Sequence, residues 1–323
     1  MEVILTGSVA FDYLMHFPGR IRDHILPDRL DSLSLSFLVD TLIRQRGGIA
    51  ANIAYTLALL GERPGVMATV GEDFEEYRAW LEQAGVDTSL IHTVPGLFTA
   101  SFFVTTDNAG AQVASFYTGA MARAAELHFT GLRPPPGLVM ISPNDPGAMI
   151  AYVGECKSLS IPYFYDPSQQ ILRLEPGDLK EGIRGSAGLF VNDYEFALIQ
   201  EKTHWGLEQI LAETGFAVIT RGEAGSDLYS GQKHWSIPAV PAEGLQDPTG
   251  VGDAFRGGFL KGYLHQMDLE CCCKLGALAA TLCAESPGPQ SQRLNLPAFL
   301  ERFEGTFGED CQVSRLSMKD GVK

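Results

Sequence analysis

A glycine-rich turn that leads into an apolar segment is the part of the sequence best suited to chemistry. It reads D-P-T-G-V-G-D-A-F over residues 247–255 and places Asp253 in the first turn of a predicted helix. Gly250 and Gly252 allow a ligand close to the backbone, and the free N–H groups of a helix start form an anion site. A carboxylate repels a phosphate unless a proton-bearing hydroxyl lies between them, so Asp253 fits a general base that activates an alcohol. The alternative is that these residues only cap a helix.

Competing signatures are absent from the sequence. There is no G-x-x-x-x-G-K-[S/T] segment of a P-loop and no H-R-D or D-F-G motif of a protein kinase. No third glycine follows Gly250 and Gly252 at the dinucleotide spacing, which disfavours a Rossmann dehydrogenase. The seven histidines show no metal-binding spacing, so a catalytic metal held by histidine is not expected.

Composition and charge restrict the class of protein further. The 323 residues are 45% hydrophobic and 20% charged, as in an ordinary globular protein with one large core and a small attached subdomain. The formal charge of −15 repels nucleic acids and anionic membrane surfaces. We therefore expect small-molecule ligands and neither nucleic acid nor membrane as partner.

The cysteines and the apolar runs indicate where the protein resides. Cys271, Cys272 and Cys273 are contiguous, so they cannot supply the spaced pairs of a disulfide framework or zinc site. We expect reduced thiols in a cytoplasmic protein. The N-terminus lacks the pattern of a signal peptide, and the best apolar run, residues 275–283, is about half the length of a membrane span.

Helical and strand patterns alternate along most of the chain, which is typical of an α/β core with a mostly parallel sheet. Gly61 and Gly85 are expected to cap the first two helices, and Asp12 to lie in the exit loop of the first strand. The predicted strands lie near residues 3–9, 65–70, 138–142, 162–166, 188–192 and 217–220, and the predicted helices near residues 49–60, 73–83, 148–159, 193–200 and 206–213.

Two segments of alternating polarity break this rhythm. Residues 32–46 and 98–117 are rich in Ser, Thr, Val and Phe, and the second turns at residues 107–110, a strong hairpin signal. Both fit an antiparallel lid that closes over a ligand and excludes water.

At the level of motifs, the sequence resembles a known family. The turn at residues 247–255 resembles the C-terminal signature of the ribokinase-like (PfkB) carbohydrate and nucleoside kinases. R-G-G-I-A-A-N at residues 46–52 resembles the family's glycine-pair signature. N-D-Y-E at residues 192–195 and T-R-G-E-A-G at residues 220–225 are similar to its N-x-x-E and T-x-G-x-x-G motifs. These motifs stand in the family's order over most of the chain, and local features look like the prokaryotic adenosine-kinase-like branch.

The resemblance implies a ribokinase-like, three-layer α/β/α core with a mostly parallel sheet and a small β-strand lid. Residues 1–11 would begin the core, and residues 12–46 and 87–120 would form lid strands inserted in it. Residues 47–86 and 121–323 would complete the kinase core, with the nucleotide site in its C-terminal half.

The same resemblance implies roles in phosphoryl transfer from ATP. Asp253 would be the general base, and the anion hole would come from the N–H groups of Gly250, Val251 and Gly252. Pro248, Val251 and Arg256 depart from common family residues. Pro248 removes one N–H contact, and Arg256 either clamps a phosphate or pairs with an acid on the same helix face.

Metal and nucleotide positions are implied in the same way. Asn192 and Glu195 would hold Mg²⁺ largely through water, because a hard cation prefers oxygen ligands. A monovalent cation such as K⁺ is a further possibility near Asp247. The nucleotide would be lined by Asn192, Thr220, Gly222, Gly225 and Thr249.

The acceptor positions implied by the resemblance are Asp12, Gly47, Gly48 and Asn52, whose polar groups and open backbone suit sugar hydroxyls. An apolar wall for a nucleobase could come from Phe102, Phe116 and Met121, which as lid residues could equally be lid core. His16 and His24 near the lid hinge are further candidate substrate contacts.

These features lead to the hypothesis of an ATP-dependent kinase that phosphorylates the 5′-hydroxyl of a nucleoside, most simply adenosine. A sugar kinase of the ribokinase or fructokinase type is the alternative, and a non-catalytic nucleoside-binding protein of the same fold is the third. The sequence is compatible with a monomer or a homodimer.

Overall fold

The computed structural model describes residues 2–25, 34–292, 294–309, 311 and 313–317. Its main sheet holds nine strands, and all neighbours are parallel except for the last two pairings at one end. In spatial order the strands are β13 (Lys233–Ile237), β12 (Ser226–Ser230), β11 (Ala217–Thr220), β10 (Gly188–Asn192), β9 (Tyr163–Tyr165), β8 (Leu138–Ile141), β1 (Val3–Thr6), β4 (Gly65–Val70) and β5 (Ile91–Thr93).

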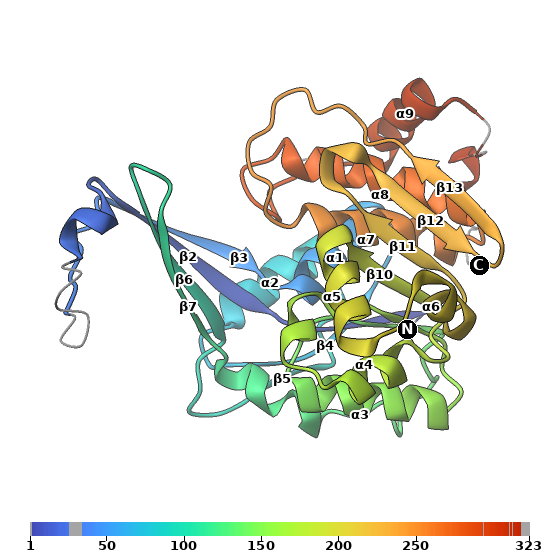
Figure 1. Ribbon diagram of the computed structural model, residues 1–323, viewed down its shortest axis with the longest axis horizontal. Coiled ribbons are helices and arrows are strands. Elements are labelled where there is room, and N and C mark those ends of the chain that lie inside the picture. Colours follow the sequence, from blue (N-terminus) through green and yellow to red (C-terminus); the bar gives the residue numbers. More distant parts are fainter. Residues whose placement is uncertain (1, 26–33, 293, 310, 312, 318–323) are drawn as a thin grey trace.

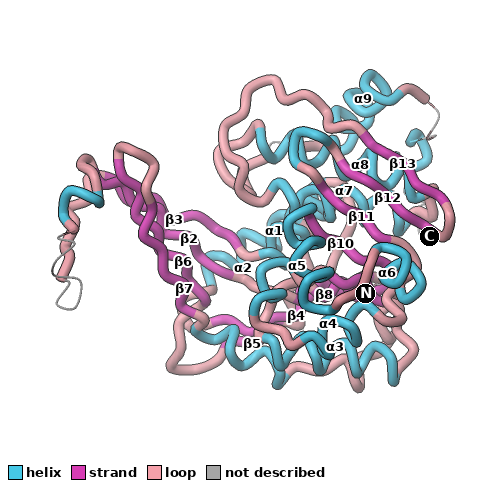
Figure 2. Tube along the Cα trace, viewed as in Figure 1, coloured by secondary structure: helices cyan, strands magenta, loops and turns pink. Residues whose placement is uncertain are grey.

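Helices cover both faces of this sheet (Figures 1 and 2). Successive residues of a strand point to opposite faces, so Leu5 packs in one buried cluster and Ile4 in the other. The first face is covered by α1 (Ile49–Leu59), α2 (Glu75–Ala84), α7 (Val251–Leu264), α8 (Leu269–Ala284) and α9 (Leu296–Phe307). The second is covered by α3 (Pro146–Ser158), α4 (Pro176–Ile183), α5 (Asp193–Thr203) and α6 (Leu207–Glu213). The prediction of a three-layer α/β/α core is confirmed.

Glycines allow α7 to lie very close to its neighbours. A Cβ added at Gly257 would stand 2.8 Å from Thr56 Cβ of α1. One added at Gly258 would stand 2.5 Å from the Leu275 carbonyl oxygen of α8. These small residues bring the backbones of α1, α7 and α8 into contact, so α7 is fixed between the other two helices.

A smaller sheet protrudes from the core (Figure 1). It orders β3 (Thr41–Gly47), β2 (Ala10–Phe17), β6 (Ala100–Asp107) and β7 (Gln112–Tyr117). The hairpin between β6 and β7 forms where it was predicted, but β2 and β6 run parallel, so a purely antiparallel lid is wrong. Between β2 and β6 the chain passes through the core, and such a crossover allows parallel pairing.

Two further details differ from the sequence expectations for this lid. Asp12 lies within strand β2, not in a loop, because the polarity alternation continues beyond the first apolar run. In the segment expected at residues 32–46, the strand begins only at Thr41, and residues 32 and 33 lie outside the described part of the chain.

One cysteine prediction is wrong. Cys271 of α8 forms a disulfide with Cys311. The two cysteines are 40 residues apart, and the prediction considered only the contiguous run at residues 271–273. Cys156, Cys272, Cys273 and Cys283 are buried free thiols, as expected.

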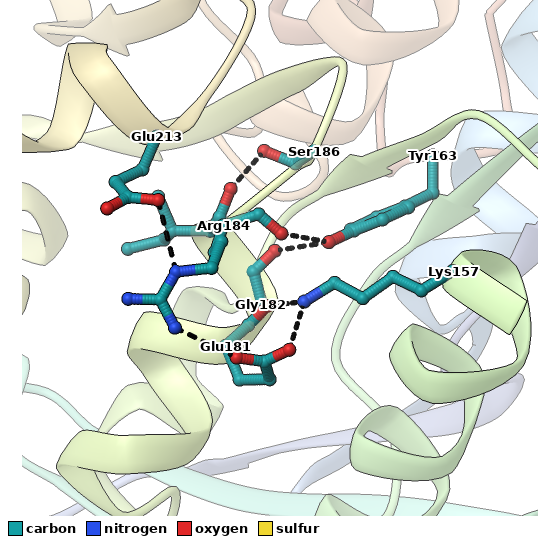
Figure 3. Close-up of polar contacts among 8 residues, drawn as sticks. Lys157, Tyr163, Glu181, Gly182, Arg184, Ser186 and Glu213 are labelled. Carbon is teal, nitrogen blue, oxygen red and sulfur yellow. Dashed lines mark hydrogen bonds and ion pairs between the residues drawn. The ribbon is translucent and has the colours of Figure 1, made fainter. Parts of the chain in front are cut away.

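The amino ends of the strands carry a polar network of structural character (Figure 3). Arg184, just after α4, donates from Nε to Glu213 and from Nη1 to Glu181, each over 3.1 Å. Lys157 of α3 also pairs with Glu181, and the Tyr163 hydroxyl at the start of β9 donates to the Arg184 carbonyl over 3.0 Å. The network ties α3, α4 and α6 together, away from the opposite strand edge described next.

Candidate active site

The carboxyl ends of the parallel strands collect most of the predicted site residues. Strand order reverses at β1, which has β4 on one side and β8 on the other, and ligands bind at such a switch point in open α/β sheets. Asn192 ends β10 and pairs in register with Thr220, which ends the adjacent β11. Asp166 follows β9 directly, so three polar side chains stand on neighbouring strand ends.

The glycine-rich turn forms the start of α7 as predicted. Gly250 is the N-cap with a φ of +76°, a conformation that favours glycine. A Cβ there would also stand 2.4 Å from Pro289 Cβ. Asp253 lies in the first turn, where the leading N–H groups have no partner within the helix. This places free backbone donors and a carboxylate side by side. The Val251 N–H, predicted for the anion hole, instead donates to the Pro248 carbonyl over 3.4 Å.

Asp253 is buried, with 9% of its surface exposed. Asn52 Nδ2 of α1 donates to Asp253 Oδ2 over 2.9 Å. Burial raises the pKa of Asp253 to about 7, although Arg256 and Asn52 pull it down. A carboxyl that titrates near neutrality is suited to accept a proton from an alcohol.

Arg256 lies one turn after Asp253 and points across the site. Its Nη2 donates to Asp166 Oδ1 over 2.6 Å. Arg256 therefore pairs with an acid outside its own helix, and not with one on the same helix face. Its Nη1 lies 3.0 Å from where a Cβ of Gly252 would be. Asp166 Oδ2 and Arg256 Nε are buried without hydrogen-bond partners among the described residues. The guanidinium therefore lies beside the glycine turn, held by the Asp166 carboxylate that follows β9.

Asn192 and Glu195 are joined by a capping box at the start of α5. Glu195 Oε2 accepts from the Asn192 N–H over 2.8 Å, and Asn192 Oδ1 accepts from the Glu195 N–H over 2.7 Å. Burial and then repulsion from Asp166 raise the pKa of Glu195. Within the described residues, no cluster of three or more His, Cys, Asp or Glu side chains is arranged as a metal site.

The predicted nucleotide residues lie on three separate segments, of which the first is Asn192 at the end of β10. Thr220 ends β11, and Gly222 and Gly225 lie in the turn that follows, where a Cβ at Gly225 would meet the Ile237 carbonyl oxygen at 2.1 Å. Gly222 has a φ of +53°, and a Cβ added there would have nothing within 4 Å, so its backbone is open to approach. Thr249 lies in the loop before α7 and donates its N–H to Asp247 Oδ1 over 2.8 Å.

The glycine pair joins strand β3 to helix α1 against Asp12. A Cβ at Gly47 would lie 2.4 Å from Asp12 Oδ2, and one at Gly48 would lie 2.6 Å from the Ser8 carbonyl oxygen. Gly48 needs to be glycine, because its φ is +93° and its neighbours are backbone atoms, whereas at Gly47 the missing side chain leaves space for the Asp12 carboxylate. Burial, and then repulsion from Asp247, raise the pKa of Asp12 to about 6.

Strand register places Asp12 beside the predicted aromatic residues. Gln45, Asp12, Phe102 and Phe116 occupy one row across the four lid strands, so their side chains share a face. Phe116 is 48% exposed. Met121 differs, because it is buried against Ala10 and Ala100 at the base of the lid.

His16 and His24 are engaged within the lid. His16 hydrogen-bonds Asp40 over 2.8 Å and Asn108 over 3.0 Å, and the His24 ring packs on Phe17. The helical turn of His24 lies at the far end of the lid (Figure 1), so the structure does not bring it to Asp253.

Similarity to known proteins extends over most of the chain. The profile of the pfkB family carbohydrate kinases matches residues 19–295. The chain belongs to the pfkB family. Its predicted ATP-dependent kinase class and its ribokinase-like fold are thereby confirmed.

Two relatives show how far this pfkB-family similarity extends. The chain is 34% identical to the nucleoside kinase of Burkholderia thailandensis in complex with inosine, with a TM-score of 0.85 and coverage of 95% of this chain and 98% of that one. The same enzyme in complex with ADP-inosine gives 35% identity, a TM-score of 0.83 and coverage of 95% and 96%. A nucleoside kinase of Methanothermobacter thermautotrophicus is 29% identical over 318 residues, 97% of this chain and 98% of its own length.

Four residues of this kinase's site were not recognised in the sequence. Asp166 could have been found in the sequence, because it ends a predicted strand, and ligands bind at the carboxyl ends of the strands in such sheets. Gln45 Oε1 is buried without a partner in the described structure, yet its place beside Asp12 depends on strand register. Tyr77 and Gln290 contact the site from distant segments and carry no motif.

Within the described residues, no helix combines the length and apolar composition required to span a membrane.

Proposed function

We propose that this pfkB-family kinase transfers the γ-phosphoryl group of ATP to a primary hydroxyl of a nucleoside, with Asp253 as the general base. The observation that carries the proposal is the buried Asp253 carboxyl, whose pKa is raised to about 7, beside the N-terminus of α7. A base poised near neutrality accepts a hydroxyl proton effectively, and the adjacent N–H groups favour phosphoryl oxygens.

The proposed phosphoryl transfer balances with the acceptor hydroxyl, ATP and Asp253. The acceptor hydroxyl gives its proton to Asp253, and its oxygen forms a bond to the γ-phosphorus. The bond from that phosphorus to the β,γ-bridging oxygen breaks, and ADP carries away the electron pair. The N–H groups of Gly252 and Asp253 and the nearby Arg256 guanidinium stabilise charge on the transferred group.

The site also offers oxygen atoms for Mg²⁺. Asp166 Oδ2 is buried without a hydrogen-bond partner in the described structure, and Glu195 lies close enough for the two carboxyls to repel. A divalent cation would relieve that repulsion, and when bound it neutralises phosphate charge. Asn192 Oδ1 and Glu195 Oε2 each accept one capping bond, but Glu195 carries a second carboxyl oxygen and a negative charge, so Asp166 and Glu195 are the better candidates. The monovalent cation near Asp247 remains a prediction.

The acceptor is proposed to be a purine nucleoside, with adenosine as the first choice. The inosine complex of the similar Burkholderia thailandensis enzyme supports this class. In this chain, Asp12 would hold the ribose hydroxyls, and Phe102 and Phe116, in the same row of the lid, would pack against the base.

A competition assay tests the acceptor. Adenosine, inosine, ribose and fructose are mixed at equal concentration with limiting Mg·ATP, and the phosphorylated products are identified by mass spectrometry. We expect nucleoside 5′-monophosphates as the main products. Sugar phosphate as the main product would replace the nucleoside proposal by the sugar-kinase alternative and leave the role of Asp253 intact.

A further inference from the structure

A chain of buried hydrogen bonds runs from the lid hinge to Asp253. The Tyr77 hydroxyl of α2 donates to the Gly47 carbonyl oxygen over 2.8 Å. Gln290 Nε2 bonds the Tyr77 hydroxyl and donates to Asn52 Oδ1 over 2.9 Å. Asn52 Nδ2 then donates to Asp253 Oδ2 over 2.9 Å.

The direction of every bond in this chain follows from its two ends. The Gly47 carbonyl and an ionised Asp253 carboxylate can only accept. Tyr77 spends its single hydrogen on Gly47, so its oxygen accepts from Gln290. The Gln290 amide hydrogens therefore face Tyr77 and Asn52, which turns the Asn52 carbonyl toward Gln290 and its NH₂ group toward Asp253.

Nothing else in the described structure fixes these amides. Gln290 Oε1 is buried and has no hydrogen-bond partner there, so the two bonds from Nε2 orient its amide. Without Gln290, Asn52 Oδ1 has no hydrogen-bond partner in the described structure, and the bond to Asp253 alone is left to hold the amide. The loop that carries Gln290 also contacts the lid, since a Cβ at Gly288 would lie 3.2 Å from the Gln45 amide.

We propose that Gln290 is a positioning residue, which together with Tyr77 holds the Asn52 amide so that it donates to Asp253. The inference rests on the proposed function, because it assumes that Asp253 is the base. It adds that the base is held in place by residues of α2 and of the loop after α8, and that the hinge glycine Gly47 belongs to the same hydrogen-bonded unit.

The charged groups that act on Asp253 give this proposal a signature in the pH profile. Arg256 lowers the pKa of Asp253, Asp166 and Asp12 raise it, and the Asn52 hydrogen bond lowers it. Gln290 is uncharged, so its removal leaves the three charges in place and affects Asp253 only through Asn52. Loss of the Asn52 bond moves the acidic limb of kcat/KM to higher pH.

The main test is Gln290→Leu, with Gln292→Leu as its matched control. Gln292 lies in the same loop and is buried, and neither of its amide atoms has a hydrogen-bond partner in the described structure. We expect kcat of Gln290→Leu to fall about tenfold to a hundredfold, as for a misplaced catalytic group, with the acidic limb shifted upward and KM for ATP little changed. The control keeps the wild-type kcat and pH profile.

The effect must also depend on Asp253. In an Asp253→Asn background, we expect Gln290→Leu to cause no additional loss. A wild-type kcat and acidic limb in Gln290→Leu, or an equal additional loss in both backgrounds, overturns the positioning role while the base assignment stands. High activity in Asp253→Asn alone instead overturns the proposed function.

A second variant covers the case in which Gln290→Leu does not fold, as judged by circular dichroism. Tyr77→Phe keeps the ring and the bond from Gln290 to Asn52, and removes only the contact to Gly47 and the acceptor for Gln290. We expect a kcat loss smaller than about tenfold, with the acidic limb again shifted upward. An unchanged limb in folded Tyr77→Phe contradicts the proposal.

Discussion

At the scale of single residues, burial and local charge act in opposite directions on the Asp253 carboxyl. Burial favours its protonated form, while Arg256 and Asn52 favour the carboxylate. The balance leaves a group whose proton affinity suits transfer near neutral pH. The same balance has a thermodynamic cost, because a carboxyl with a raised pKa destabilises the folded state when it is ionised.

Asp253→Asn tests the base directly. The amide keeps the shape and can accept from Asn52, but it cannot take a proton. We expect kcat to fall by roughly two to four orders of magnitude, the range for a lost general base, with ATP affinity nearly unchanged in a calorimetric titration. A variant that retained more than about a tenth of the wild-type kcat would contradict the assignment.

The same variant should change stability with pH in a defined direction. The penalty for ionising Asp253 is absent below its ordinary pKa of 3.8, grows as the pH rises toward about 7, and is complete above that value. Asn at this position carries no such penalty. We expect the Tm of Asp253→Asn to exceed that of the wild type at pH 8 and the difference to shrink at pH 5. An equal difference at both pH values would indicate that Asp253 is not ionised against a penalty.

Asp12→Ala separates acceptor binding from nucleotide binding. A carboxylate that holds sugar hydroxyls contributes about 1.5 to 3 kcal/mol, so KM for the nucleoside should rise by roughly tenfold or more while KM for ATP barely changes. Steady-state kinetics with each substrate varied in turn measures both. An equal loss for both substrates would place Asp12 outside the acceptor site.

At the scale of elements, the packing of α7 against α1 sets the distance between Asp253 and Asn52. In Gly257→Ala, the new Cβ meets Thr56 Cβ at 2.8 Å and the Ile53 carbonyl oxygen at 3.1 Å. We expect a loss of about 1 to 3 kcal/mol in unfolding free energy from overpacking, together with a lower kcat because the helices separate.

A matched control exists in α3. Gly154 also lies within a helix, but a Cβ there has nothing within 4 Å. Gly154→Ala should therefore leave kcat unchanged and stabilise the protein by about 0.5 to 1 kcal/mol through helix propensity. Urea unfolding of both variants makes the comparison, and equal effects would show that α1 and α7 tolerate separation.

Local motifs were sufficient to predict much at this scale, but they could not predict which distant residues pair. The start of α7 follows from residues adjacent in sequence, so its geometry could be predicted. The capping box of Asn192 and Glu195 is equally local, but these two residues were predicted only as ligand contacts. Arg256 pairs with Asp166 across 90 residues, and Gln290 meets Asn52 across 238. Neither pairing leaves a local pattern. The parallel register of β2 and β6 was hidden for the same reason, since it depends on a path through the core.

At the scale of the whole molecule, the disulfide between Cys271 and Cys311 links α8 to the C-terminal segment. For a sequence separation of 40 residues, the loop-closure relation gives roughly 3 to 4.7 kcal/mol of stabilisation. We expect Cys271→Ser, and the wild type in reductant, to lose a similar amount of unfolding free energy. Cys271→Ser in reductant should lose nothing further. A wild type insensitive to reductant would show that the bond does not form under those conditions.

The parallel pairing of β2 with β6 also determines how the lid is attached. The chain enters and leaves the lid twice, once through β2 and β3 and once through β6 and β7. Four covalent connections therefore join it to the core. The strand register places all four at one end of the lid, at Ala10, Gly47, Ala100 and Tyr117. A closing movement therefore has to bend these four connections together. The lid therefore consists of two separate chain segments. To exchange it for the lid of a relative, both segments have to be replaced together, and the pairing register of β2 with β6 has to be kept.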